Sequence, residues 1–173
     1  MIRETTFDDI EQVIALYNQA IEYFKENNIN QWQNNYPNRQ SLINDINNKV
    51  SFVLEQDNRI TGSMACISKG DVDYNTIYEG AWLNDESYLT IHRIVVNNSV
   101  KNKGVAQQMM QEAYKYARNL NIYNIRIDTH QDNQAMLRFL KKEQFVFCGI
   151  VYINGISKRL AFQKKINNSQ FNP

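Results

Sequence analysis

One stretch of the chain combines an apolar segment, a basic loop containing glycine, and the start of a helix. Residues 91–96 read Ile-His-Arg-Ile-Val-Val, and residues 101–104 read Lys-Asn-Lys-Gly. From Val105 to Leu120, apolar side chains recur at helical spacing. A loop at a helix start presents free backbone N–H groups at the positive end of the helix dipole. The stretch therefore predicts a seat for a phosphate or pyrophosphate.

Two histidines lie in the strands of the same region. His92 belongs to the apolar segment before the loop, and His130 ends the next apolar segment along the chain. An imidazole changes charge near neutral pH, so either residue could act as the base that takes a proton from an amine. A structural role inside the sheet is the alternative for both.

The elements that must position these residues alternate between strands and helices. Runs of alternating or continuous apolar residues predict strands, and apolar residues at helical spacing predict helices. The expected strands are Ile2–Glu4, Val50–Glu55, Ile60–Ser68, Tyr88–Val96, Tyr123–Thr129, Phe145–Ile153 and Lys158–Ile166. The expected helices are Ile10–Phe24, Arg39–Asn48, Lys103–Leu120 and Asp132–Lys142. Residues 71–86 read as a loop-rich insertion with a strand fragment around Ile77.

Local motifs set several boundaries of these elements. Thr6 and Asp9 have the spacing of a capping box before the first helix, and Asp132 is expected to cap the last helix. Asn154-Gly155 between the last two strands favours a type I′ turn.

Composition excludes several classes of protein. The chain has 173 residues, which suits one domain, and its 19 basic and 18 acidic residues leave a charge of +1. Such a balance argues against broad binding to nucleic acid or to a membrane surface. The chain has no apolar run of about 18 residues and no signal-peptide layout, so a cytoplasmic location is expected. Cys66 and Cys148 lack metal-ligand spacing and are expected as buried free thiols, with no metal site.

The order of elements and two motifs resemble the GCN5-related N-acetyltransferase (GNAT) superfamily. The family's motif Arg/Gln-x-x-Gly-x-Gly/Ala reads Lys-Asn-Lys-Gly-Val-Ala at residues 101–106, with Lys in the first position. Asn133 matches an Asn after the next strand, and Phe145 matches the Phe of a later Gly-Phe pair in which Gln144 replaces Gly. The resemblance implies an α/β class, or α+β, single domain over residues 1–166. Its mixed sheet would be roughly six- to seven-stranded, with helices on both faces. Residues 167–173 are expected to form a frayed tail.

The resemblance also implies acetyl-CoA as co-substrate and no metal. In the family, loop amides bind the pyrophosphate, and the edge of the strand before the loop binds the pantetheine arm and polarises the thioester carbonyl. An Asn on the next helix holds the cofactor arm. The residues in matching positions here are Ile94, Val95, Val96, Lys101, Asn102, Lys103, Gly104, Val105, Ala106 and Asn133.

Two positions that often carry catalytic groups in the family hold other residues. Arg93 stands where many members have a Glu base, and Leu140 stands where many have a Tyr acid. The chemistry must then use other groups, for which His92 and His130 are candidates, or rely mainly on positioning and the oxyanion site. A charge in a central strand needs a partner, and we predict that Arg93 pairs with Asp128 on the neighbouring strand.

The acceptor site is less defined by sequence. Trp32, Tyr36, Trp82 and Tyr88 fall in segments that build the family's acceptor pocket and could cover an apolar or cationic amine, with ordinary core packing as the alternative. The acidic residues 79, 85 and 86 are weaker candidates and are better explained as a solvated loop. The acceptor would be an amine of a small molecule or peptide. The aromatic terminal hairpin would permit a homodimer.

These observations predict an N-acetyltransferase that moves an acetyl group from acetyl-CoA to a primary amine by direct attack in a ternary complex. The alternative is a non-catalytic acyl-CoA sensor or scaffold, which the residues at positions 93 and 140 favour. A third interpretation is a general nucleotide-binding α/β domain, which would bind an adenylate without needing pantetheine.

Overall fold

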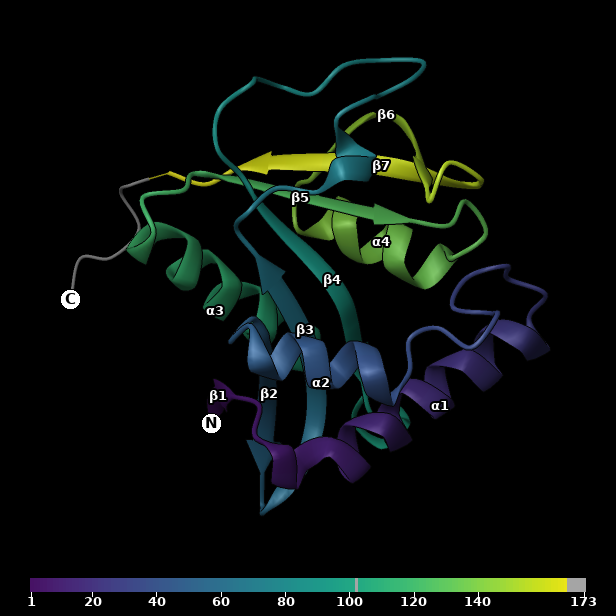
Figure 1. The fold of residues 1–173 in the computed structure, drawn as a ribbon, viewed down its shortest axis with the longest axis vertical. Helices are drawn as coiled ribbons and strands as arrows, with labels where there is room; N and C mark the ends of the chain where they lie inside the picture. The colour runs from purple at the N-terminus through teal and green to yellow at the C-terminus, as the bar shows by residue number, and fades with distance from the viewer. Residues whose placement is uncertain (102, 168–173) are drawn as a thin grey trace. The chain divides into compact units, whose positions relative to one another are not determined.

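A computed structural model describes residues 1–101 and 103–167 of the chain (Figure 1). The strands are β1 (Ile2–Glu4), β2 (Ser51–Gln56), β3 (Arg59–Ile67), β4 (Leu89–Val96), β5 (Asn124–Thr129), β6 (Val146–Ile153) and β7 (Ser157–Lys165). The α-helices are α1 (Ile10–Glu26), α2 (Arg39–Asn47), α3 (Val105–Asn119) and α4 (Gln134–Lys142). Short 3-10 turns lie at η1 (Phe7–Asp9), η2 (Val72–Tyr74) and η3 (Asn98–Val100). None of the helices in the described part of the chain is long and apolar enough to cross a membrane.

The strands form one mixed sheet in the order β1-β2-β3-β4-β5-β7-β6. The β4–β5 pair is parallel, and β1–β2, β2–β3, β5–β7 and β6–β7 are antiparallel. The predicted mixed sheet is thus confirmed, with seven strands among residues 1–101 and 103–167. The chain divides into two compact units, which are described separately below.

The first unit contains Met1–Cys66 and His92–Glu112. Apolar side chains of α1 and α2, including Tyr17 and Leu42, pack against Val53 and Val95 on one face of its strands. A Cβ built on Gly62 would lie 2.5 Å from Met109 Sδ, so α3 packs closely against the opposite face. Helices therefore cover both faces of this part of the sheet, as predicted.

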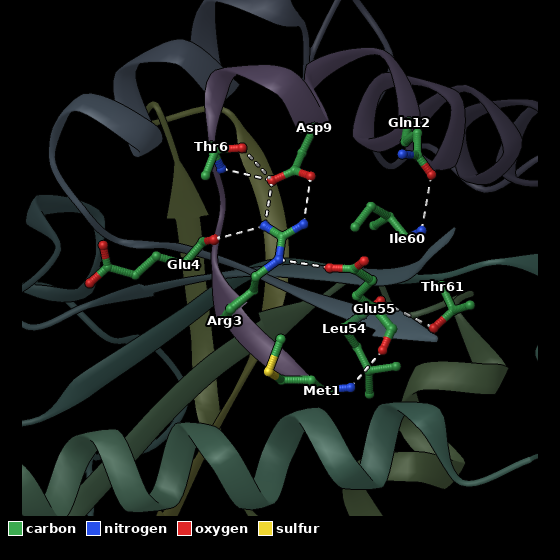
Figure 2. Close-up of polar contacts among 10 residues, drawn as sticks. All are labelled: Met1, Arg3, Glu4, Thr6, Asp9, Gln12, Leu54, Glu55, Ile60 and Thr61. Atoms are coloured by element: carbon green, nitrogen blue, oxygen red, sulfur yellow. Dashed lines mark hydrogen bonds and ion pairs between the residues drawn. The ribbon is translucent and has the colours of Figure 1, made fainter. Parts of the chain in front are cut away.

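An arginine joins the first strand, the first helix and the second strand of this unit (Figure 2). Arg3 donates to both oxygens of Asp9 at 2.7 and 2.8 Å and to Glu55 Oε2 at 2.8 Å. The backbone N–H of Thr6 donates to Asp9 Oδ2 at 2.8 Å, which confirms the predicted capping box. The ion pairs fix where α1 begins relative to β1 and β2.

The second unit contains Ile67–Ile91 and the described residues from 113 onward. The long connection between β3 and β4 runs along β6 and β7 (Figure 1). Tyr74 donates to Asp128 Oδ1 at 2.9 Å, and the backbone N–H of Leu83 donates to Gln163 Oε1 at 3.1 Å. The strand fragment predicted near Ile77 appears as a single bridge between Tyr78 and Ile150.

The terminal hairpin and the cysteines follow the sequence predictions. Asn154 and Gly155 have φ angles of 52° and 71°, and Ile156 N donates to Ile153 O, as a type I′ turn requires. Cys66 and Cys148 are buried and free. Most of the predicted frayed tail lies outside the described residues.

Candidate functional site

The predicted anion seat lies where η3 leads into α3, inside the first unit. The first hydrogen bond of α3 runs from Gln108 N to Gly104 O at 2.9 Å. The backbone N–H groups of Val105 and Ala106 precede that bond and have no carbonyl partner within the helix. They lie at the positive end of the helix dipole, where an anion is stabilised. Asn102, one of the predicted ligands, lies outside the described residues.

Gly104 gives this loop both its backbone conformation and its openness. Its φ is +80°, which disfavours any residue with a side chain, and a Cβ built there would meet no atom within 4 Å. The glycine is therefore required by the turn, and the space in front of it is open to a ligand.

The two loop lysines differ in their surroundings. The Lys101 ammonium lies 4.5 Å from the centre of the Tyr23 ring in α1, a cation–π contact within the first unit. Lys103 is exposed, and its ammonium has no ion pair or hydrogen bond among the residues that the structure describes. Lys103 is thus the better placed of the two to meet an anion on the loop.

The strand before the loop has an irregular backbone at the residue that occupies the family's base position. The described β4–β5 ladder contains the pairs Leu89–Ile125 and Thr90–Arg126, both before this point. Arg93 has a φ of +52°, a left-handed conformation that is rare for a residue with a side chain. Ile94, Val95 and Val96 complete the strand, and Val95 packs into the core of the first unit.

The Arg93 guanidinium binds a buried carboxylate of α2. Nε and Nη2 each donate to an oxygen of Asp45 at 2.8 Å, and Nη1 donates to the hydroxyl oxygen of Tyr36. The predicted pair of Arg93 with Asp128 is therefore wrong. The side chains of Arg93 and Asp45 are only 9% and 10% exposed. Burial raises the pKa of Asp45, while the attraction of Arg93 opposes that rise.

Two further hydroxyl-bearing residues are buried in the first unit. Burial raises the pKa of Tyr17 far above its ordinary value, although the charge of Arg93 opposes that rise, so Tyr17 stays protonated. The Ser63 side chain is fully buried, and its hydroxyl also opposes the rise in the pKa of Tyr17. Tyr17 belongs to the apolar core cluster of the first unit, so its hydroxyl and that of Ser63 are polar groups in largely apolar surroundings.

The two histidines have different environments. His92 is half-buried in β4, and its charge would favour the ionised form of Asp45. His130 follows β5, and its Nδ1 accepts the backbone N–H of Asp132 at 3.2 Å. Burial and then Arg159 lower the pKa of His130, while Asp132 opposes them. Their proposed catalytic roles stay predictions.

The residue that caps α4 is the predicted cofactor ligand rather than its neighbour. Asn133 Oδ1 accepts the backbone N–H of Met136 at 3.2 Å, so the expected cap by Asp132 is wrong. Asn133 is buried, and its role in holding the cofactor arm stays a prediction. Leu140, at the family's acid position, is fully buried in the core.

The four aromatic residues predicted for the acceptor site fall into two groups. Trp32 lines a cavity of about 410 Å³ in the first unit, between α1 and the segment before α2, while Tyr36 binds Arg93. In the second unit, Trp82 and Tyr88 hold the Arg126 guanidinium, which lies 4.2 and 3.9 Å from their ring centres. A cationic side chain of the protein itself, Arg126, therefore packs against both of these rings.

Sequence reasoning missed Asp45. A signal for it exists, because Asp45 lies beside Leu42 and Ile46 on the buried stripe of α2, and a carboxylate there needs a partner. Among the described residues, no three side chains of His, Cys, Asp or Glu lie together as metal ligands would.

Comparisons with known proteins agree on the family. The acetyltransferase (GNAT) family model matches residues 15–145. No curated protein matches the chain. A solved GNAT-family acetyltransferase from Streptococcus agalactiae 2603 is 32% identical and has a TM-score of 0.89, covering 97% of this chain and 96% of that chain.

More distant solved structures share the fold. A GNAT-family acetyltransferase from Listeria monocytogenes 4b F2365 is 19% identical, with a TM-score of 0.73, covering 96% of this chain and 94% of that chain. The PaiA N-acetyltransferase from Thermoplasma acidophilum, solved with coenzyme A, is 16% identical, with a TM-score of 0.71 and coverage of 95% and 98%. Because the family match spans most of the chain, the chain belongs to the acetyltransferase (GNAT) family, and the protein is an acyl-CoA-dependent acetyltransferase.

Proposed function

We propose that the protein transfers the acetyl group of acetyl-CoA to a primary amine by direct attack in a ternary complex. The observation that carries the cofactor part is the open loop at the start of α3, where Gly104 leaves room before the first-turn amides of Val105 and Ala106. These amides, together with Lys103, would bind the pyrophosphate. The full set of proposed cofactor contacts is Ile94, Val95, Val96, Lys101, Asn102, Lys103, Gly104, Val105, Ala106 and Asn133.

Direct attack needs three things from the protein. The backbone of residues 94–96 would orient the pantetheine arm and polarise the thioester carbonyl through an N–H group. The amine must be neutral when it attacks, and a free alkylamine with a pKa of about 10.4 must first lose a proton. The leaving thiolate must gain one. Positioning supplies much of the remaining rate enhancement in such a complex.

A non-catalytic acyl-CoA sensor is the second candidate, because Arg93 and Leu140 stand where many relatives carry their catalytic groups. It shares the loop and the cofactor contacts with the enzyme. The two candidates therefore differ only in turnover. A cytoplasmic location, an acceptor of small-molecule or peptide type and a homodimer stay predictions.

Ligand-dependent stability and thiol release test the proposal together. Acetyl-CoA and CoA should raise the melting temperature more than ADP does, because a ligand that binds only the folded state stabilises it. Thiol release from acetyl-CoA over a panel of primary amines should then reveal turnover. Stabilisation without turnover on any amine supports the sensor, and equal stabilisation by ADP would argue against a pantetheine site.

A charge reversal locates the phosphate seat. Lys103→Glu should weaken acetyl-CoA binding about tenfold, because it places a negative charge where the pyrophosphate would lie. Lys158→Glu is the matched control, since Lys158 is an exposed lysine of β7 with no part in the loop. Equal binding by the two variants would show that the anion binds elsewhere.

A further inference from the structure

The Tyr36 hydroxyl is anchored from one side by the buried Arg93–Asp45 pair. Both oxygens of Asp45 accept from Arg93 at 2.8 Å, which fixes the plane of the guanidinium. The remaining Nη1 donates to Tyr36 Oη. Tyr36 itself is 43% exposed. The phenol is thus held by a rigid buried support while its other side is open to a ligand.

The direction of this hydrogen bond leaves the phenol proton unused. A guanidinium has only donors, so the Tyr36 oxygen must be the acceptor. The hydroxyl hydrogen therefore points away from Arg93. Among the described residues, the hydrogen bond that Tyr36 accepts from Arg93 is its only one, so no hydrogen bond there takes up the phenol proton. The tyrosine can donate this proton to a bound molecule.

Arg93 links Tyr36 to the strand that carries the proposed acyl site. Arg93 directly precedes Ile94, Val95 and Val96, whose backbone is the proposed seat of the thioester. Its partner Asp45 lies on α2, so the guanidinium lies on the face of the strand that α1 and α2 cover. All of these residues belong to the first unit.

We infer that Tyr36 is the proton-transfer residue of this enzyme, held in place by Arg93 and Asp45 as positioning residues. The inference rests on the proposed acetyl transfer. The neutral amine nitrogen forms a bond to the thioester carbon, and the carbon–sulfur bond breaks. The Tyr36 hydroxyl gives its proton to the departing thiolate, and the phenolate takes the proton that the new amide nitrogen releases.

This route balances without any further reactant. One N–C bond replaces one C–S bond, and one proton moves from nitrogen to sulfur by way of Tyr36, which ends in its starting form. Arg93 can donate to the Tyr36 oxygen in the phenol and in the phenolate, so the residue keeps its place throughout. The route also accounts for enzyme activity in a chain with Arg93 and Leu140 at the family's usual catalytic positions.

Removing one oxygen atom tests the inference. Tyr36→Phe keeps the ring and removes the proton, so kcat with acetyl-CoA and the best amine of the panel should fall about 100-fold. The KM for acetyl-CoA and the melting temperature should stay close to those of the wild type.

Tyr78→Phe is the matched control, because Tyr78 is another exposed tyrosine, 50% exposed, in the second unit. It should leave kcat unchanged. A Tyr36→Phe protein with wild-type kcat would overturn the inference while leaving acetyl transfer intact, and so would a change confined to the KM for the amine. A wild-type protein that binds acetyl-CoA but acetylates no amine would overturn the proposed function and this inference with it.

Discussion

Two arginines of the first unit each bind both oxygens of a buried aspartate, and they differ in the side chain that a third nitrogen binds. Arg3 donates to both oxygens of Asp9, and its Nε donates to Glu55 (Figure 2). Arg93 donates to both oxygens of Asp45, and its Nη1 donates to Tyr36. The first network ends on a carboxylate with no proton to give. The second ends on a hydroxyl that has one.

The two networks also differ in burial. The side chain of Arg3 is 30% exposed, whereas that of Arg93 is 9% exposed. A buried ion pair carries a large desolvation cost and is a weak way to gain stability. We therefore infer that the two arginines have different roles. Arg3 joins β1, α1 and β2, whereas Arg93 fixes the position of a functional group.

The largest expected effect is the loss of the buried carboxylate. Asp45→Ala leaves the Arg93 charge buried without its partner, and we expect a loss of about 3–5 kcal/mol in the free energy of unfolding. Urea denaturation followed by circular dichroism measures this. Asn47→Ala, at an exposed position of the same helix, is the control. A loss below about 1 kcal/mol would mean that Asp45 is not needed to compensate the buried charge of Arg93.

The Arg3 network, whose arginine is partly exposed, should contribute less to the free energy of unfolding, and its contribution should depend on pH. The hydrogen bond from Arg3 lowers the pKa of Asp9 to about 2, against an ordinary value of 3.8. Because the folded state binds this proton more weakly than the unfolded state, the stabilisation is complete above about pH 4 and is lost as the pH falls towards 2. Asp9→Asn should therefore cost about 1–2 kcal/mol at pH 7, a value reduced by solvent around Arg3.

Denaturation at several pH values checks this prediction. The stability difference between wild type and Asp9→Asn should shrink steadily below about pH 4 and nearly vanish close to about pH 2. Asp8→Asn, an exposed neighbour in the same turn, is the control. A difference that stays constant with pH would show that the charge of Asp9 is not the source of its contribution.

The two networks also show how far sequence reasoning reaches. Thr6 and Asp9 are three residues apart, so local spacing is enough to predict their capping box. Asp45 and Arg93 are 48 residues apart in the sequence, and no local pattern joins them. The prediction of an Arg93–Asp128 pair assumes a regular strand with alternating faces. The φ of +52° at Arg93 breaks that regularity and helps to explain why a different carboxylate is its partner.

The same contrast between local patterns and long-range contacts applies to the rest of the molecule. Periodicity predicts the seven strands and four α-helices found in the described part of the chain, because each element depends on residues close together in the sequence. The contacts of two predicted acceptor residues are harder to predict, since Trp82 and Tyr88 meet Arg126, from a distant segment, only in the fold. The error in the cap of α4 is a shift of one residue, from Asp132 to Asn133.

The smallest expected effect concerns the outer carboxylate of the Arg3 network. Glu55→Gln keeps an oxygen that can accept from Arg3 Nε but removes the negative charge. The two side chains are 30% and 26% exposed, so water screens their attraction, and we expect a loss of only about 0–1 kcal/mol. Any loss should fade in about 1 M salt, where the screening length is about 3 Å. If Glu55→Gln instead cost as much as Asp45→Ala, the contact of Arg3 with Glu55 would matter as much to stability as the pair beneath Tyr36. The exposed fraction of an arginine side chain would then not distinguish an arginine that joins secondary-structure elements from one that positions a reacting group.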